Sequence, residues 1–189
     1  MNFKEYRNLK KSVDKELSTR KHERDENGNV VINMTVNDDS GFLSPFSENN
    51  ISVISTDVAD FIENNTHSLP SNESLTLKIH SNCIDDNEKE VYKNAIKEYY
   101  AEKYLANEKE LKRNYFVALI LLLAGIFVMT VSIFLNEHNI EIWSYVVDIA
   151  SWVLLWEAVD ITLLVNRTLS VQRKRYLSYL SMNIQFLNE

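Results

Sequence analysis

The chain has 189 residues, of which 45% are hydrophobic and 25% charged, and its formal net charge is −7. With only 3 glycines and 2 prolines, it is poorly supplied for glycine-rich phosphate loops or turn-dense β-sandwiches. The single cysteine, Cys83, excludes an intramolecular disulfide and a zinc site made from paired cysteines. The length alone favours one compact unit.

The N-terminal residues predict an amphipathic helix with a basic flank, because apolar residues recur at helical spacing between residues 3 and 17. Three interpretations of this basic segment stay open. It could bind a nucleotide-like anion or an oligonucleotide through phosphate contacts, lie on anionic lipid headgroups, or pair with residues 25–77 of its own chain, which hold 9 acidic residues and no lysine or arginine. The candidate ligand-binding residues are Lys10, Lys11, Arg20, Lys21 and Arg24.

A small α+β arrangement is expected to follow. Apolar and polar residues alternate, as in half-buried strands, or form short apolar runs in three segments: 30–36, 51–55 and 75–79. A short helix is expected over 58–64, capped by Thr56 or Asp57. No glycine or proline interrupts residues 87–124, so a long helix is expected to continue from the soluble domain into the apolar part of the chain.

Two apolar stretches then indicate membrane segments. Phe116–Leu135 has no charged residue, and its twenty residues suffice to cross a hydrocarbon layer about 30 Å thick. It begins too far from Met1 to be a signal peptide. Trp143–Val165 is also long enough, and the short connection between the stretches requires an antiparallel helical hairpin. Basic residues flank the outer ends and are absent from the connection, which predicts that both termini are cytosolic.

The expected fold is therefore an α+β cytosolic domain followed by a two-helix antiparallel transmembrane hairpin in a membrane protein. Four parts are expected along the chain: a soluble domain with its basic N-terminal helix (1–86), a connecting helix (87–114), the hairpin (115–165) and a basic cytosolic tail (166–189).

Three carboxylates in the second apolar stretch are the most informative feature for function. An aspartate at the bilayer centre costs about 2.5–3.5 kcal/mol, so these groups need partners, protonation, water or an interfacial position. Self-association around a wet pore would satisfy them, and the pore-lining candidates are Asp148, Ser151, Glu157 and Asp160. As an alternative, Glu157 and Asp160 pair with basic residues at the membrane boundary, and Asp148 hydrates near the outer interface.

No enzymatic activity is expected from these residues. A Gly-x-Ser-x-Gly elbow is absent from the sequence, the four histidines lack metal-ligand spacing, and Cys83 is expected to be a packing residue rather than a nucleophile. Neither a metal site nor a cofactor is predicted.

Four segments carry a resemblance to known proteins: DDSGFLSPF (38–46), LTLKIHSNCIDDNEKEVYKNAIKEYY (75–100), WVLLWEAVD (152–160) and RTLSVQRKRYL (167–177). They resemble small bacterial two-span membrane proteins with a cytosolic α+β domain. The layout is similar to membrane effectors of anti-phage defence, in particular the channel subunit of the Hailong-type system. This resemblance implies a location in the bacterial cytoplasmic membrane. It also implies control by an oligodeoxyadenylate, made by a partner nucleotidyltransferase, that keeps the channel closed until infection.

Residues and resemblance together predict a cytosolically gated, homo-oligomeric channel or pore, with a tetramer as the expected assembly. Its expected partners are other copies of the chain, the lipid bilayer and a nucleotide or single-stranded oligonucleotide. The alternative is a membrane-anchored interaction module that recruits a cytosolic partner and conducts no ions.

Overall fold

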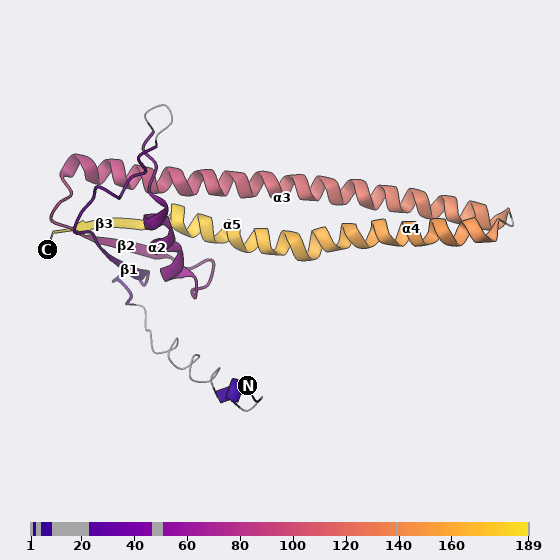
Figure 1. Cartoon of the computed structure of the whole chain (residues 1–189), viewed down its shortest axis with the longest axis horizontal. Helices are drawn as coiled ribbons and strands as arrows, with labels where there is room; N and C mark the ends of the chain where they lie inside the picture. The colour runs from indigo at the N-terminus through magenta and orange to yellow at the C-terminus, as the bar shows by residue number, and fades with distance from the viewer. Residues whose placement is uncertain (1, 3–4, 9–22, 47–50, 139, 189) are drawn as a thin grey trace. The chain divides into compact units, whose positions relative to one another are not determined.

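The computed structural model describes residues 2, 5–8, 23–46, 51–138 and 140–188 (Figure 1). The internal contacts of the chain divide it into two compact units. Unit 1 comprises Met1–Leu69, Glu73–Lys93 and Ser181–Glu189, and unit 2 comprises Pro70–Asn72 and Asn94–Leu180. Each unit is described by itself.

Unit 1 contains a three-stranded parallel sheet in the order β1-β2-β3. Its strands are β1 (Val30–Thr35), β2 (Leu75–His80) and β3 (Asn183–Leu187). A helix, α2 (Thr56–Thr66), connects β1 to β2, because parallel neighbours require a crossover connection (Figure 1). The strands predicted over 30–36 and 75–79 are confirmed as β1 and β2.

The sheet buries one row of apolar side chains across its strands. The register places Ile32 opposite Leu77, and Leu77 opposite Ile184. All three side chains are buried, whereas Asn33 on the alternate face of β1 is exposed and Lys78 beside it is half-buried. The period-two alternation of the sequence therefore identified the core face correctly.

Helix α2 packs its apolar residues into the core of unit 1 and begins at Thr56, two residues before the predicted start at residue 58. The side chain of Ser55, rather than Thr56 or Asp57, caps it by accepting a hydrogen bond from the backbone N–H of Val58 at 3.4 Å. The strand predicted over 51–55 is wrong. Ile51 and Ile54 form isolated bridges, that of Ile54 antiparallel to Leu43, and no strand develops because the following residues already enter the helix cap.

Helix α3 (Asp86–Glu137) runs without interruption for 52 residues, which confirms the predicted long helix. A reciprocal capping box fixes its start. The carboxylate of Asp85 accepts from the backbone N–H of Glu88 at 2.8 Å, and the carboxylate of Glu88 accepts from the backbone N–H of Asp85 at the same distance. Within unit 1, Tyr92 of α3 stacks on Phe42 with ring centroids 4.3 Å apart.

The predicted two-helix antiparallel transmembrane hairpin after an α+β domain is wrong. The fold is a mixture of helices and a sheet with one long apolar helix, α3, and α3 alone among the described helices is long and apolar enough to cross a membrane. Beyond it lie α4 (Glu141–Asp160), a π-helical turn η1 (Ile161–Val165) and α5 (Asn166–Leu180). Three carboxylates and the π-helical turn interrupt the second apolar stretch, and length alone had suggested a second span.

The segment predicted as a basic tail, 166–189, has regular structure. Its first part forms α5, and its last part forms β3 on the far side of β2 from β1. Met182 and Ile184 are buried, which explains why this end of the chain joins the sheet. Of the N-terminal helix predicted over 3–17, the described residues 5–8 are helical and the remainder lies outside the described residues.

Candidate functional site: an apolar surface around a polar seam

The candidate site lies in unit 2, where α3 and α4 run side by side (Figure 1). On α3, small residues recur every seven positions at Ala118, Gly125 and Ser132, and all three are buried. Seven residues make two helical turns, so these side chains share one face. We call this line of contact between the two helices the seam.

Small residues recur with the same spacing on α4, at Ser144, Ser151 and Ala158, and all three are buried. Hydrogen bonds connect the two helices at two levels. Ser132 Oγ donates to the Ser144 carbonyl at 2.9 Å, and Ser144 Oγ donates to the Ser132 carbonyl at 3.1 Å. Two turns further along, Ser151 Oγ donates to the Gly125 carbonyl at 3.1 Å. Small residues and serine hydroxyls are the interface chemistry of helices that pack inside lipid.

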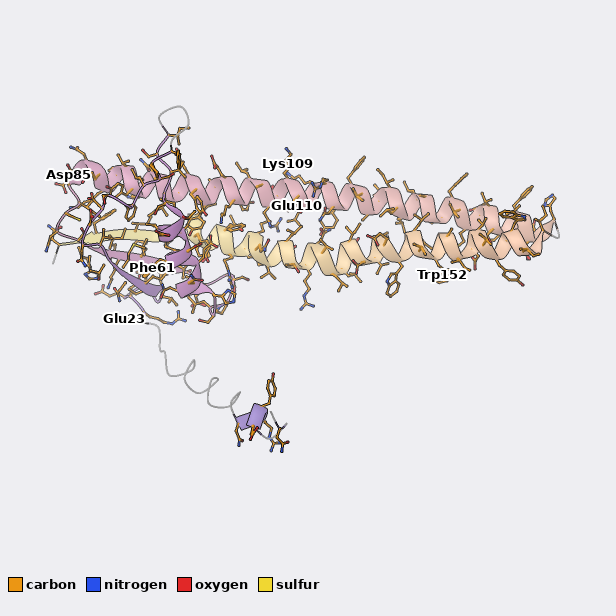
Figure 2. The ribbon with its side chains drawn as sticks, viewed as in Figure 1. Glu23, Phe61, Asp85, Lys109, Glu110 and Trp152 are labelled. Carbon is orange, nitrogen blue, oxygen red and sulfur yellow. The ribbon has the colours of Figure 1, made fainter. Side chains whose placement is uncertain are left out.

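The large apolar side chains of unit 2 point away from the seam, and Figure 2 shows Trp152 on the side of α4 away from α3. Phe127 is 69% exposed and Trp156 is 71% exposed. In the most apolar part of α3 only 17% of the residues are buried. Further exposed members of this apolar surface are Phe116, Leu119, Ile120, Leu123, Phe134, Ile149 and Val153.

The structure separates the four predicted pore-lining residues. Ser151 is 1% exposed and lies in the seam, so its hydroxyl is already bonded within one copy of the chain. Glu157 is exposed, whereas Asp148 and Asp160 are half-buried. None of the three carboxylates forms an ion pair or a side-chain hydrogen bond with another residue in the part of the chain that the structure describes.

The basic residues at the same end of unit 2 have other partners. Glu108 lies between two cations, 3.2 Å from Lys112 Nζ and 3.5 Å from Arg173 Nη1. Arg113 pairs with Glu110 at 3.3 Å. Charge pairing of Glu157 and Asp160 with these cations, the alternative interpretation of the sequence, is therefore not formed within one copy.

The π-helical turn changes which residue enters the seam. Continued seven-residue spacing would place Val165 there, yet Val165 is 41% exposed and Asn166 is 1% exposed. The backbone N–H of Asn166 bonds to the Ile161 carbonyl, five residues earlier, and this wider turn advances the helix by one residue. Neither polar atom of the Asn166 carboxamide has a partner among the described residues.

The five candidate ligand-binding residues are not brought together by the described part of the chain. Lys10, Lys11, Arg20 and Lys21 lie outside the described residues. Arg24 pairs with Glu73 at 2.7 Å and also donates to the Gly28 carbonyl at 2.6 Å. Arg24 therefore pairs with the acidic middle of its own domain, which is one of the three interpretations left open for the basic segment.

Unit 1 has a small polar cavity of about 210 Å³ where β1 and β2 end, lined in part by Asn37, His80 and Cys83. Cys83 is exposed, so the packing role expected from the sequence is wrong, and its thiol lies 3.1 Å from Ser81 Oγ. No group of three histidine, cysteine or acidic side chains that could hold a metal occurs in the described ranges.

No family model, no curated protein and no solved structure matches this chain. The resemblance to Hailong-type channel subunits therefore stays a prediction, and it rests on the layout of the chain more than on particular residues.

Sequence reasoning missed two features of the site. It did not relate the seven-residue spacing of Ser144, Ser151 and Ala158 to the matching spacing of Ala118, Gly125 and Ser132. Comparing the two stretches at intervals of seven residues would have revealed the seam. The importance of Asn166 could not be found that way, because it depends on the π-helical turn.

Proposed function

We propose that the apolar part of α3, residues 116–135, crosses a lipid bilayer. The observation that carries this proposal is the inverted pattern of the helix pair, with small and polar residues in the seam and large apolar side chains on the outside. In water, the hydrophobic effect drives large apolar side chains into the interface between helices. A monomeric soluble protein rarely exposes contiguous apolar surface of this extent.

Membrane insertion can be tested with the full chain expressed in bacteria. We expect the protein to stay with the membrane fraction after an alkaline carbonate wash and to float with liposomes in a density gradient. Phe127→Glu and Trp156→Glu together should lower the inserted fraction, because a charge facing lipid is costly. The matched double substitution Phe46→Glu and Phe61→Glu, at exposed phenylalanines of unit 1, should leave insertion unchanged. Release of the wild-type chain by the wash would contradict the proposal.

We further propose that several copies, in the sequence-based expectation four, assemble in the bacterial cytoplasmic membrane as a cytosolically gated channel. The support is the set of three carboxylates, Asp148, Glu157 and Asp160, which have no partner among the described residues. Carboxylates in a low-dielectric region need compensation, and a shared aqueous path between copies would provide it. Carboxylates beside such a path would favour cations.

Reconstituted full-chain protein provides the test of conduction. We expect potassium flux into proteoliposomes, with the preference for cations over anions reduced in Asp148→Asn and in Glu157→Gln. The control Asp60→Asn removes an exposed carboxylate from α2 in unit 1 and should leave selectivity unchanged. Unchanged ion selectivity in both Asp148→Asn and Glu157→Gln would contradict an acidic ion path. Proteoliposomes without any potassium flux would contradict conduction itself.

Control of this channel by a nucleotide or oligonucleotide, and a role in anti-phage defence, are further parts of the proposal. They are supported by the basic composition of residues 1–24 and by the similarity in layout to Hailong-type channel subunits. Lys10→Gln with Lys11→Gln should weaken oligodeoxyadenylate binding at a fixed, stated salt concentration, since each phosphate contact contributes to affinity. The control is Lys109→Gln with Lys174→Gln, which makes the same change of charge outside the N-terminal segment. Equal binding by both double variants would exclude the N-terminal segment as the binding site.

A membrane-anchored interaction module is the second candidate, and a groove in unit 1 favours it. This groove has a volume of about 290 Å³, and its lining includes Met34, Asp38, Phe42, Asp57 and Phe61. An apolar groove edged by carboxylates suits a peptide with apolar and basic residues. Vesicles that stay electrically tight while Phe61→Ser abolishes capture of a cytosolic partner would favour this candidate over the channel.

A further inference from the structure

We propose that unit 2 holds one anionic phospholipid, with an acyl chain in a groove between α3 and α4–η1 and the phosphate on Arg167. This inference rests on the proposed membrane location of the apolar part of α3. It is independent of conduction and of any nucleotide ligand.

The acyl-chain part of the site is an apolar groove of about 390 Å³. Leu119 and Leu122 of α3 line one side, and Val159 and Leu163 line the other. Ala118 and Ala158 also line the groove, and their small side chains leave it depth. An acyl chain suits this lining because it needs no hydrogen-bond partner.

The headgroup part of the site is a second groove of about 300 Å³ on α5, lined in part by Arg167, Val171 and Arg175. One line of residues, four apart, connects the two grooves: Val159, Leu163, Arg167, Val171 and Arg175. Residues four apart lie close to one face of an α-helix, and the wider turn of η1 keeps the line from winding away from that face. The chain therefore presents one continuous strip that changes from apolar to basic along its length, as a phospholipid changes from acyl chain to phosphate.

The charges around the headgroup groove favour a lipid with a net negative charge. Arg167 is exposed and has no ion pair with another described residue. The nearby carboxylate of Glu108 is already engaged by Lys112 and Arg173, at 3.2 and 3.5 Å. A guanidinium binds a phosphate through two parallel hydrogen bonds, and basic pockets at the cytoplasmic side of membrane helices recognise anionic headgroups in this way.

The site has two halves, and each can be altered with a matched control. Arg167→Gln removes a headgroup contact, and Lys174→Gln makes the same change of charge on the same helix outside the groove. Leu119→Trp fills the acyl-chain groove, and Leu123→Trp places the same bulk at an exposed position of α3 outside it. All four substitutions replace residues on the protein surface, so the variants should fold.

The experiment measures binding of phosphatidylglycerol and phosphatidylcholine to the full chain in detergent by native mass spectrometry. We expect phosphatidylglycerol to bind at least about tenfold more tightly than phosphatidylcholine, because only the former carries a net negative charge. Arg167→Gln should weaken its binding about fivefold, which corresponds to ~1 kcal/mol for one basic side chain at an anionic surface. Leu119→Trp should weaken binding of both lipids, and Lys174→Gln and Leu123→Trp should leave binding unchanged. Added inorganic phosphate should not displace the lipid, because it lacks the acyl chain.

Three results would overturn the site. Equal binding of phosphatidylglycerol and phosphatidylcholine would show that no headgroup contact is made. Equal losses of lipid binding in Arg167→Gln and Lys174→Gln would show diffuse electrostatic attraction instead of a defined site. Displacement of the lipid by inorganic phosphate would show a simple anion site. A wild-type chain that fails to float with liposomes would instead overturn the proposed membrane location, so the two failures are distinguishable.

Discussion

Ser151 donates its side-chain hydroxyl to the backbone carbonyl of Gly125, at 3.1 Å, in the seam between α3 and α4. A Cβ atom added to Gly125 would lie 2.7 Å from Leu155 Cδ2 and 3.3 Å from the Leu155 backbone nitrogen. The hydrogen bond and the close approach therefore depend on the same glycine. A side chain at this position would have to separate the helices.

Gly125→Ala should destabilise unit 2 by about 1–3 kcal/mol, because overpacking forces either Leu155 or the α4 backbone to move. The measurement is reversible unfolding of the detergent-solubilised protein, followed by circular dichroism. Gly41→Ala is the control, since a Cβ atom there meets nothing within 4 Å. A Gly125→Ala protein as stable as wild type would show that the helices do not pack at the distance described.

The two serines at the outer level of the seam allow a double-mutant cycle. Each hydroxyl bonds to the backbone carbonyl of the other residue, so Ser132→Ala and Ser144→Ala each remove one such bond. We expect a cost of about 0.6 kcal/mol for each, as is typical between membrane helices. Because neither substitution removes the carbonyl that the other hydroxyl uses, the two costs should add.

Thr130→Ala is the control for this cycle, because the Thr130 hydroxyl bonds to the Ile126 carbonyl of its own helix. It should change the free energy of unfolding by less than about 0.5 kcal/mol. A large coupling between Ser132 and Ser144 would mean that the contact between their hydroxyls, 3.3 Å apart, dominates instead.

The elements with a clear local signal could be predicted from the sequence. The alternation around Ile32 and Leu77 identified β1, β2 and their core face, and the absence of helix breakers identified α3. β3 could not be predicted in this way, because its pairing with β2 joins residues 107 positions apart, as in Thr76 and Asn183, and its apolar residues follow a basic helix. Such pairing is decided by tertiary contacts rather than by local preference.

The candidate site was only partly predictable for a related reason. The carboxylates of Asp148, Glu157 and Asp160 are evident in an apolar stretch, yet whether they have partners is a property of the folded chain. Arg24 shows the same limit, since composition suggested a ligand and the structure pairs it with Glu73. The length of the second apolar stretch also led to the wrong prediction of a second membrane span, because sequence periodicity gives no sign of the π-helical turn at Ile161–Val165.

Tyr92 should make the stability of the protein depend on alkaline pH. Burial raises the pKa of its phenol above the ordinary value of 10.0, and the hydrogen bond it donates to Asp39 at 2.9 Å raises it further, as does the charge of that carboxylate. Above pH ~10 the unfolded chain loses this proton while the folded chain keeps it. The contribution is therefore complete below pH ~10 and is lost as the pH rises toward the folded-state pKa.

Tyr92→Phe should lower stability at neutral pH by about 1 kcal/mol, the usual worth of one hydrogen bond, and flatten the decline at alkaline pH. Denaturant unfolding of the full chain at a series of pH values between 8 and 11, as set by that ordinary pKa of about 10, provides the measurement. Tyr104→Phe removes a phenol elsewhere on α3 and should preserve the wild-type slope. Identical slopes for wild type and Tyr92→Phe would contradict the raised pKa.

We expect that replacing Asn166 by an apolar residue stabilises the protein. Its carboxamide is buried, and neither polar atom has a partner among the described residues, an arrangement that costs about 1–3 kcal/mol. Asn166→Leu keeps nearly the same shape without the polar atoms, so we expect the free energy of unfolding in detergent to rise by about 1 kcal/mol. Asn114→Leu, at a half-buried position of α3, is the control for added apolar surface and should have a smaller effect.

A second variant separates the polarity of Asn166 from its fit in the seam. Asn166→Ala removes the carboxamide without adding bulk, so it too should avoid the cost of the unpaired polar atoms, although the space left behind offsets part of the gain. If both variants unfold more easily than wild type, the carboxamide makes a stabilising interaction within the folded assembly. If both are more stable but lose ion flux in proteoliposomes, Asn166 is retained for conduction at the expense of stability, as polar residues inside membrane proteins commonly are.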